Sequence, residues 1–522
     1  MGMMDRDDGP TQTRILVAIA SYGTSNDHYL ERIVREYRSM SFAVDIVVLS
    51  NIDKKLDPGI DCLVGLPNKN PWSLPFAHKK LFADRCDRYD LFIYSEDDIL
   101  ITERSLRAWM EVNTLLASNE VAGFLRVEYG SDGGRSYPDA HANFHWDPSS
   151  VRRRGNYTLA HFTNEHAACY VLTRSQLHRA LSSGGFDVPP HEGKYDLLCT
   201  AATDPYTQCG LTKLIPVSHL DAFTVHHMSN RYVGTMGVTA EEFGKQTDAL
   251  MRVALNDSST ESLLPARSWH WRFAYAKDYY EPVTREVTSL IPKRARNVLS
   301  IGCGSGAIER WLVKQGLRVV AVPLDPIIAS GAAVDGVEIV PASAVSQIES
   351  KYKEHFDCVL CLNVLHLAPA PQKLLSQSRA FMHPKSTLIV QSPNMMSLRA
   401  LRPLFTTTPR LTSFSDYEST GAHFSSARTV RRWCTDSGFS VERTLGVVAV
   451  RGNGMVGKTS AIGDYLPGLL SHLLAPSIIV TATKVQMDSN PNGERTIDNA
   501  ARTRPSGIAA TSKADELISA PP

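Results

Sequence analysis

The chain has 522 residues, which is too many for one ordinary hydrophobic core, so we expect more than one domain. Its 43% hydrophobic and 21% charged residues are ordinary for a soluble globular protein, and its formal net charge of +1 argues against a nucleic-acid-binding surface. The sequence contains neither a run of about eighteen apolar residues nor an N-terminal signal segment, so we expect a cytoplasmic protein without a membrane span.

Nine cysteines are scattered along the chain, as is usual in a reducing compartment. Cys358 and Cys361 form a CxxC pair, but both lie inside the apolar run 356–362. That setting favours a buried strand over a redox or zinc site.

The first half of the chain alternates patterns that are typical of strands and helices. Buried strands are predicted over 15–20, 44–49 and 91–94, and helices over 27–40 and 74–88. A strand–helix–strand series with this spacing is typical of βαβ units and predicts a parallel sheet. Two passages rich in glycine and proline, 130–148 and 184–193, are expected to form long loops.

Three carboxylates follow the last of these strands. Glu96, Asp97 and Asp98 come shortly after the apolar run 91–94, at the end of a strand where ligands bind in open α/β sheets. Such crowding of negative charge is costly unless a cation neutralises it, and hard divalent ions prefer oxygen ligands. The cluster therefore predicts a divalent-metal site that can hold a diphosphate leaving group, with a solvated turn as the alternative.

This acidic triplet resembles the DxD region of GT-A glycosyltransferases, in a variant form. The resemblance covers about residues 14–235 and implies a nucleotide-sugar donor, a Mn or Mg ion, and a glycan or glycolipid acceptor. It also implies a nucleoside site formed by Ser21 and Tyr22 in the first loop and by Asn51 after the second strand.

Two other segments extend this resemblance. The helix over 75–82 resembles the basic helix that precedes the DxD motif, so that Lys79 or Lys80 can approach a phosphate or the acidic triplet; an exposed helical face is the alternative for either lysine. Later in the chain, His226 and His227 end a strand-like run. The resemblance implies that His226 is a metal ligand, and a hydrogen-bonded structural pair is the alternative.

The segment 160–172 resembles the acceptor-side loop and strand of GT-A enzymes. An inverting transfer needs a carboxylate near the acceptor hydroxyl as its general base. The candidates, between which the sequence does not choose, are Glu165, Glu192, Asp196 and Asp204.

A glycine-rich loop follows a predicted strand at 297–301 in the second half of the chain. Gly302, Gly304 and Gly306 stand at alternate positions, which lets the backbone turn sharply into a helix and approach a ligand closely. A second strand then leads to Asp325, an acidic residue placed to accept both hydroxyls of a ribose. Both NAD and S-adenosylmethionine (SAM) fit this arrangement.

The later motifs favour SAM. The segment 356–366 resembles the fourth strand and following loop of class I SAM-dependent methyltransferases, and 385–394 resembles their fifth strand. This resemblance covers about residues 290–485 and implies that Asn363 contacts the cofactor. For methyl transfer to oxygen, it offers His366 as the base, unless that histidine simply packs at the mouth of the site.

Three other segments bear on this interpretation. Ala342–Ala344 stands where the family often has an acidic residue for the adenine amine, and His383–Ser386 stands where it often has Lys-Pro-Gly-Gly. Gly452–Thr459 satisfies the phosphate-loop pattern GxxxxGK[ST]. It falls, however, where the methyltransferase fold closes with antiparallel strands, expected at 445–450 and 478–485, so we do not expect an ATPase site.

Together the patterns predict an α/β chain of two domains. A GT-A-like nucleotide-sugar-binding Rossmann-like domain is expected at 14–245 and a class I methyltransferase Rossmann-like domain at 290–485, with a helical connector at 246–289 and disordered tails at 1–13 and 486–522. The implied function is metal-dependent glycosyl transfer plus SAM-dependent methyl transfer in polysaccharide or glycolipid biosynthesis. The alternatives are a chain in which only the glycosyltransferase is active and the second domain is a binding module, or a nucleotidyltransferase as the first domain.

Overall fold

The computed structural model describes residues 12–256, 261–264, 266, 275–341, 351–398, 417–450, 458–461 and 474–485. The tails expected to be disordered, at 1–13 and 486–522, lie almost wholly outside the described residues, and so do residues 342–344. Within the described ranges, the structure contains no helix with the length and apolar character that crossing a membrane requires.

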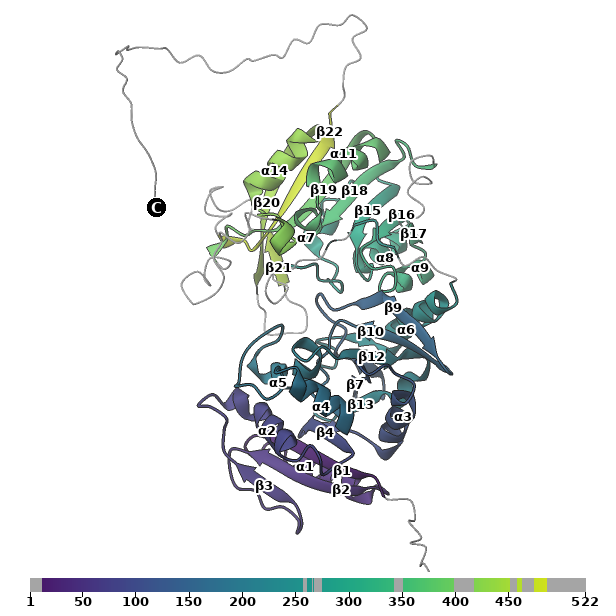
Figure 1. Ribbon diagram of the computed structural model, residues 1–522. Coiled ribbons are helices and arrows are strands. Elements are labelled where there is room, and N and C mark those ends of the chain that lie inside the picture. Colours follow the sequence, from purple (N-terminus) through teal and green to yellow (C-terminus); the bar gives the residue numbers. More distant parts are fainter. Residues whose placement is uncertain are drawn as a thin grey trace, which may run out of the picture. The chain divides into compact units, whose positions relative to one another are not determined.

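The first part of the chain forms a five-stranded sheet in which four strands are parallel (Figure 1). The strand order is β11-β4-β1-β2-β3, and β11 runs antiparallel to β4. The elements are β1 (Arg14–Ser21), α1 (Asp27–Ser39), β2 (Ala43–Ser50), β3 (Asp61–Val64), η1 (Pro71–Phe76), α2 (Ala77–Asp84), β4 (Leu91–Glu96) and β11 (Cys169–Thr173). The predicted strands at 15–20, 44–49 and 91–94 are confirmed, and the helix predicted over 74–88 is divided between η1 and α2.

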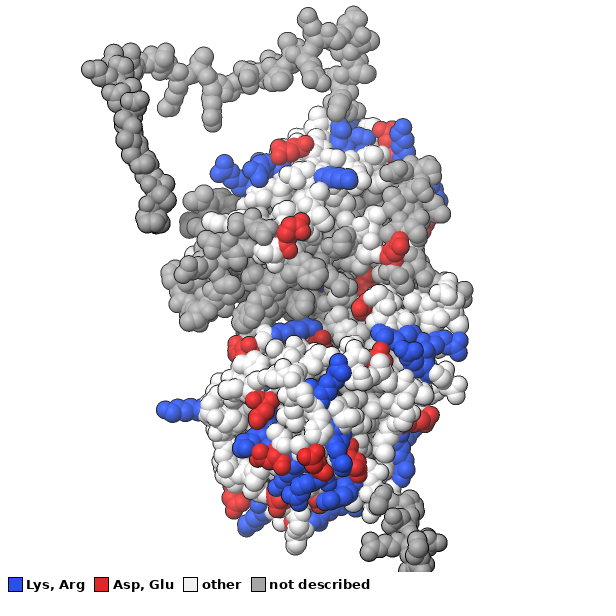
Figure 2. All heavy atoms as spheres, in the orientation of Figure 1, with Lys and Arg blue, Asp and Glu red and all other residues white. Residues whose placement is uncertain are grey.

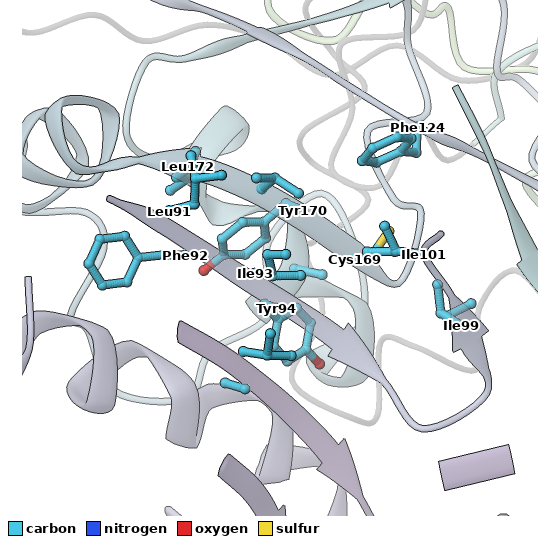
Figure 3. Packing of buried hydrophobic residues seen from close by; sticks show 14 of the residues in the cluster. Leu91, Phe92, Ile93, Tyr94, Ile99, Ile101, Phe124, Cys169, Tyr170 and Leu172 are labelled. Atoms are coloured by element: carbon cyan, nitrogen blue, oxygen red, sulfur yellow. The ribbon is translucent and has the colours of Figure 1, made fainter. Parts of the chain in front are cut away.

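The strand β4 lies deep in the core of this sheet (Figure 3). Phe92, Ile93 and Tyr94 are fully buried, as expected for a strand covered on both faces. Beside them on β11, the hydroxyl of Tyr170 lies 2.6 Å from Nε2 of the buried His78. This packing fixes β4 along its length, so that its carboxyl end has a defined position.

Two smaller sheets follow, with the orders β6-β12-β10-β9 and β14-β8-β7-β13-β5. Their strands and the neighbouring helices are β5 (Ile99–Leu100), α3 (Glu103–Asn113), β6 (Glu120–Ala122), β7 (Leu125–Tyr129), β8 (Arg135–Tyr137), β9 (Trp146–Arg154), β10 (Tyr157–Phe162), α4 (Arg174–Ser182), α5 (Leu197–Thr207), β12 (Thr212–Pro216), η2 (Val217–Ala222), β13 (Thr224–His227), β14 (Val238–Thr239) and α6 (Ala240–Ala254). The long loop expected at 130–148 therefore contains β8 and the start of β9. A tight turn with Gly133 at a φ of +78° lets β8 pair back onto β7.

The second large sheet has the order β17-β16-β15-β18-β19-β22-β20-β21, and its first five strands are parallel. The strand β22 runs antiparallel between β19 and β20. The elements are α7 (Arg285–Thr288), β15 (Asn297–Cys303), α8 (Ala307–Lys314), β16 (Arg318–Pro323), α9 (Ser330–Val334), β17 (Glu338–Ile339), β18 (Phe356–Leu362), η5 (Leu365–Leu367), α11 (Pro371–Phe381), β19 (Met382–Pro393), α13 (Tyr417–Thr420), α14 (Ala427–Asp436), β20 (Phe439–Val450), β21 (Lys458–Ala461) and β22 (Ser477–Lys484). The antiparallel closing strands expected near 445–450 and 478–485 are confirmed.

Two sequence motifs take the structures predicted for them. Cys358 and Cys361 are buried in β18 and pack into apolar clusters on opposite faces of the sheet, so the CxxC pair is part of a strand. Lys458 and Thr459 lie on β21, which pairs antiparallel with β20, whereas a phosphate loop would continue into a helix. The glycines of that motif, at 452–457, lie outside the described residues.

The helix α6 contacts elements of the second large sheet. The carboxylate of Glu242 accepts two hydrogen bonds from the guanidinium of Arg310 on α8, at 2.9 and 3.0 Å. Phe243 of α6 belongs to the same apolar cluster as Ile327. The connector expected at 246–289 thus begins inside a packed helix, and the domain boundaries stay predictions.

On the face seen in Figure 2, basic and acidic side chains are interspersed, in keeping with the small net charge.

Candidate functional sites

The glycine loop after β15 is a tight main-chain turn. Gly302 and Gly306 have φ values of +80° and +78°, in the left-handed region that favours glycine. A Cβ on Gly302 would lie 2.6 Å from a methyl carbon of Val364, and a Cβ on Gly304 would overlap the carbonyl oxygen of Tyr279. The close backbone turn expected from the sequence is therefore present, and its contact with a cofactor stays a prediction.

Asp325 lies just beyond the end of β16, and β16 pairs with β15, the strand that leads into the glycine loop. It is buried, and its Oδ1 accepts the N–H groups of Ile327 at 2.7 Å and Ile328 at 3.1 Å. The N–H of Leu324 donates to the carbonyl of Cys303 at 3.1 Å, which ties this turn to the glycine loop. The carboxylate thus has a fixed orientation at the edge of the sheet where a ribose acceptor was expected.

Three residues from the chain before β15 also line the glycine loop: Lys277, Tyr279 and Glu281. Lys277 forms an ion pair with Glu281 and donates to the carbonyl of Leu362 at 2.7 Å, and the carbonyl of Tyr279 accepts the N–H of Ser305 at 2.7 Å. The space enclosed there is about 10 Å³, room for about one water. All three residues fall within the segment 246–289, which was expected to be a helical connector.

Asn363 and His366 follow β18, the strand that pairs with β15. Nδ2 of Asn363 donates to Oε2 of Glu281 at 2.9 Å. Nε2 of His366 lies 2.7 Å from the carbonyl oxygen of Tyr275, so Nε2 carries the proton and Nδ1 is the basic nitrogen. Burial lowers the pKa of His366 to about 4, so its imidazole is neutral at physiological pH. Both residues lie near the glycine loop, and their roles stay predictions.

The acidic triplet lies where the first sheet ends. Glu96 is the last residue of β4, and Asp97 and Asp98 form the turn into β5. Asp97 accepts a hydrogen bond from the hydroxyl of Ser21 at 2.6 Å and one from the amide of Asn26 at 2.7 Å. The carboxyl ends of β1 and β4 therefore meet at this turn, which brings Ser21 and the triplet together as predicted.

His227, rather than His226, faces the acidic turn. Its Nε2 lies 3.0 Å from Oδ2 of Asp98, and its Nδ1 lies 2.6 Å from Oε1 of the buried Glu128. Nε2 of His226 instead lies 3.2 Å from Oδ1 of Asn230. Successive side chains of a strand point to opposite faces, so the pairing of β13 with β5 and β7 decides which histidine reaches Asp98.

The three carboxyl groups of the turn differ in protonation. Burial and the charge of Asp98 raise the pKa of Glu96 to about 8, although Arg126 opposes the rise. Burial also raises the pKa of Asp97. Burial would do the same to Asp98, but the hydrogen bond and charge of His227 bring its pKa below the usual value. The triplet therefore combines a charged Asp98 with a Glu96 that tends to stay protonated.

The triplet is not a preassembled metal site. Within the residues that the structure describes, one set of three candidate ligands has its donor atoms within 4.8 Å of one another, and it consists of Cys86, Asp87 and His178. A divalent ion at the end of β4 would require the side chains of Glu96 and Asp98 to converge on it. The metal assignment therefore stays a prediction.

The other residues of the expected nucleoside site lie in the loops after β1 and β2. Tyr22 is 52% exposed, and Oδ1 of Asn51 accepts the N–H of Gly23 at 2.7 Å. A cavity of about 590 Å³ opens nearby, between α1 and residues 52–60. Its lining does not include Ser21, Tyr22 or Asn51.

Two of the four candidate bases, Asp204 and Asp196, have structural roles. Asp204 is fully buried and forms an ion pair with Lys79, which is also buried, so that this lysine serves Asp204 and not the acidic turn. Lys80 is exposed, and its Nζ lies 2.9 Å from Oδ1 of Asp84, one helical turn away. The side chain of Asp196 caps α5.

Glu165 has a different environment from these two. Its Oε2 accepts a hydrogen bond from Nζ of Lys194 at 2.7 Å and one from the hydroxyl of Tyr195 at 2.6 Å. It lies in the loop before β11, the partner of β4, on the side where the acceptor was expected. Glu192 is exposed in the loop before α5. The geometry therefore favours Glu165 and Glu192 over Asp204 as groups that can meet an acceptor.

Known proteins resemble the second half of the chain. Residues 268–444 match the family model described as a methyltransferase domain. The ubiquinone biosynthesis O-methyltransferase of Xylella fastidiosa (strain 9a5c) is 25% identical over 113 residues, which are 21% of this chain and 46% of that protein. The protein of the same name from Xanthomonas axonopodis pv. citri is 28% identical over 120 residues, 22% of this chain and 50% of that protein. The chain thus spans about half the length of the curated relatives it matches.

Solved structures with similarity to this chain include a possible histamine N-methyltransferase from Thermotoga maritima, with 18% identity, a TM-score of 0.28, and coverage of 38% of this chain and 86% of that one. Another is a SAM-dependent methyltransferase from Methanosarcina mazei, with 15% identity, a TM-score of 0.29, and coverage of 40% and 100%. The family match agrees with the strand order and the glycine loop. The C-terminal part of this chain is therefore a class I methyltransferase domain.

Proposed function

We propose that the C-terminal part transfers a methyl group from SAM, which binds over the glycine loop with its ribose on Asp325. The observation that carries this proposal is the loop itself, where side chains at Gly302 and Gly304 would collide with their surroundings. A loop without side chains lets a ligand approach the main chain, and the neighbouring buried acid suits ribose hydroxyls. SAM, when bound, supplies an electrophilic methyl group.

The acceptor of the methyl group is proposed to be a hydroxyl. The curated relatives are O-methyltransferases by name. Methylation of a hydroxyl releases one proton, which Nδ1 of His366 can accept only in passing to water, because burial lowers the pKa of this imidazole to about 4. The chain's own residues therefore supply binding, orientation and proton acceptance.

A calorimetric titration of the full-length chain tests this proposal. S-adenosylhomocysteine (SAH) should bind, NAD should not, and Asp325→Ala should weaken SAH binding by about tenfold or more, because charge-assisted hydrogen bonds contribute roughly 1.5–3 kcal/mol each. Binding of NAD without SAH would reverse the assignment.

We further propose that the N-terminal part is a GT-A-like glycosyltransferase that holds a nucleotide sugar through a divalent ion. Support comes from four parallel strands flanked by the antiparallel β11, with three carboxyl groups at the end of β4. Among the described residues, Oε1 of Glu96 is buried without a hydrogen-bond partner, which is costly unless a ligand or proton satisfies it. An enzyme with both activities suits the assembly of a methylated polysaccharide or glycolipid.

Binding of nucleoside diphosphates with and without Mn²⁺ tests this second proposal. The wild type should bind at least one of a panel of nucleoside diphosphates in a Mn²⁺-dependent manner, and Asp98→Asn should abolish that dependence while the protein still melts cooperatively. The exposed Asp84→Asn is the matched control and should bind as the wild type does. Unchanged Mn²⁺-dependent binding in Asp98→Asn would reject the metal site.

One observation favours the alternative in which the second domain is a binding module. The carbonyl oxygen of Tyr279 stands against Gly304, where a Cβ would overlap it, so in this conformation protein atoms occupy the main-chain face that a cofactor would contact. A chain that binds nucleoside diphosphates but not SAH would support that alternative.

A further inference from the structure

The segment Tyr275–Glu281, called the strap below, covers the glycine loop. Two hydrogen bonds to its main chain attach it to the domain: Nε2 of His366 donates to the carbonyl of Tyr275, and the N–H of Ser305 donates to the carbonyl of Tyr279, each at 2.7 Å. The carbonyl of Tyr279 lies against the main chain of Gly304, where even an added Cβ would overlap it, so a ligand reaches this part of the loop only when the strap moves.

The strap contributes two opposite charges to this closed space. Lys277 is only 1% exposed and pairs with the carboxylate of Glu281. The pair is anchored to the loop after β18, since Lys277 also donates to the carbonyl of Leu362 and Asn363 donates to Glu281 at 2.9 Å. Burial raises the pKa of Glu281, and Lys277 and Asn363 oppose the rise. Charges buried in this way are costly when a partner is lost, so opening the strap favours a ligand that supplies new partners.

A zwitterionic amino acid is such a ligand. The methionine end of SAM carries a carboxylate and an ammonium group on neighbouring atoms, which are the complements of Lys277 and Glu281. The carbonyl of Leu362 is a further acceptor for an ammonium group once Lys277 turns to the carboxylate. A ligand with no amino-acid end offers neither charge.

We propose that the strap is a closing element, and that Lys277 and Glu281 recognise the carboxylate and the ammonium group of the amino-acid end of the methyl donor. This inference rests on the proposed SAM dependence of the domain. It assigns the opening and closing of the site to a segment that precedes β15, and it makes the ion pair a determinant of specificity for SAM and SAH over other adenosine compounds.

Two ligands separate this role from a general effect on the fold. SAH has the amino-acid end, whereas 5′-methylthioadenosine keeps the nucleoside and the thioether but lacks that end. In the full-length chain, Lys277→Met should weaken SAH binding by about tenfold or more, the size expected for one charge-assisted hydrogen bond, and should change methylthioadenosine binding less than about twofold. Glu281→Gln should weaken SAH in the same selective way. Lys293→Met, the loss of an exposed lysine, is the matched control and should bind both ligands as the wild type does.

Hydrogen exchange of the wild-type chain gives a second measurement that needs no variant. Saturating SAH should slow amide exchange in the peptide that covers Tyr275–Glu281, and saturating methylthioadenosine should not. The inference is overturned if Lys277→Met binds SAH within about twofold of the wild type, if both ligands are weakened equally, or if SAH leaves strap exchange unchanged. A wild type that binds neither ligand would instead reject the proposed function, and the inference with it.

Discussion

The glycine loop after β15 and the acidic turn after β4 lie at the same kind of place, the carboxyl end of an inner parallel strand, but different forces hold them. Main-chain geometry defines the glycine loop, where Gly302 and Gly306 have positive φ values. Side chains from distant parts of the chain hold the acidic turn. The hydroxyl of Ser21, 76 positions away, bonds to Asp97, and His227 contacts Asp98.

The two regions differ in how directly the sequence displays the forces that hold them. A steric requirement at alternate glycines is local, so the sequence displays it directly. A balance of buried charges depends on partners that the fold brings together, and no spacing rule reveals them. Variants of the two regions should therefore fail in different ways.

The largest effect is expected where buried charges hold the acidic turn. Replacing His227 with alanine should lower the free energy of unfolding by about 3–5 kcal/mol, because it leaves the buried carboxylates of Asp98 and Glu128 without their shared imidazole. His226→Ala is the matched control one residue away, and its partly exposed side chain should cost less than about 1 kcal/mol. Urea denaturation followed by circular dichroism measures both. Equal losses would contradict the histidine arrangement.

A smaller effect is expected from a side chain in the glycine loop. Gly304→Ala should weaken SAH binding about a hundredfold, or about 2.7 kcal/mol, because the added Cβ points toward the strap and fills the approach to the main chain that the ligand takes once the strap moves. The control is Gly244→Ala on α6, where no atom lies within 4 Å of the added carbon. Calorimetry should give unchanged SAH affinity for the control. An affinity for Gly304→Ala within about threefold of the wild type would show that the loop does not need a glycine there.

The smallest effect is a pH dependence that belongs to the charged region. Burial lowers the pKa of Lys213 to about 8, and Asp139 opposes the shift. The folded protein therefore releases this proton before the unfolded chain does, whose lysine pKa is 10.5. The free energy of unfolding should therefore rise between pH 8 and about 10.5, as the folded protein loses this proton. Below pH 8, the cost of burying the charged Lys213 should be fully present.

Lys213→Met removes this dependence. The difference in unfolding free energy between the variant and the wild type should shrink by about 2 kcal/mol from pH 8 to pH 10, measured by denaturation at each pH. Lys80→Met, on an exposed lysine, should give a difference that does not vary with pH in this range. A constant difference for Lys213→Met as well would mean that the lysine stays charged in the fold.

The inner parallel strands were predictable because they are buried on both faces and appear as unbroken apolar runs, as at 15–20 and 356–362. The small sheets were not predictable. β6, β8 and β14 have two or three residues each, too few for a period to appear, and β6 and β14 pair with strands that are distant in the chain, β12 and β8.

The candidate sites divide in the same way. The spacing from Gly306 to Asp325 follows from one βα unit, so the sequence located both. The choice between His226 and His227 required the register of β13. The burial of Asp204 required its ion pair with Lys79, 125 positions away in the chain.

The two βα series, the glycine loop, the buried CxxC strand and the position of the acidic triplet could be read from local patterns, because each depends on periodicity or on glycine sterics. Long-range packing, in contrast, pairs His227 with Asp98, neutralises Asp204 with Lys79, and brings Lys277 and Glu281 over the glycine loop. These arrangements depend on which charges become buried together. The physical reason is that desolvation and pairing energies are set by neighbours in space and not by neighbours in the chain.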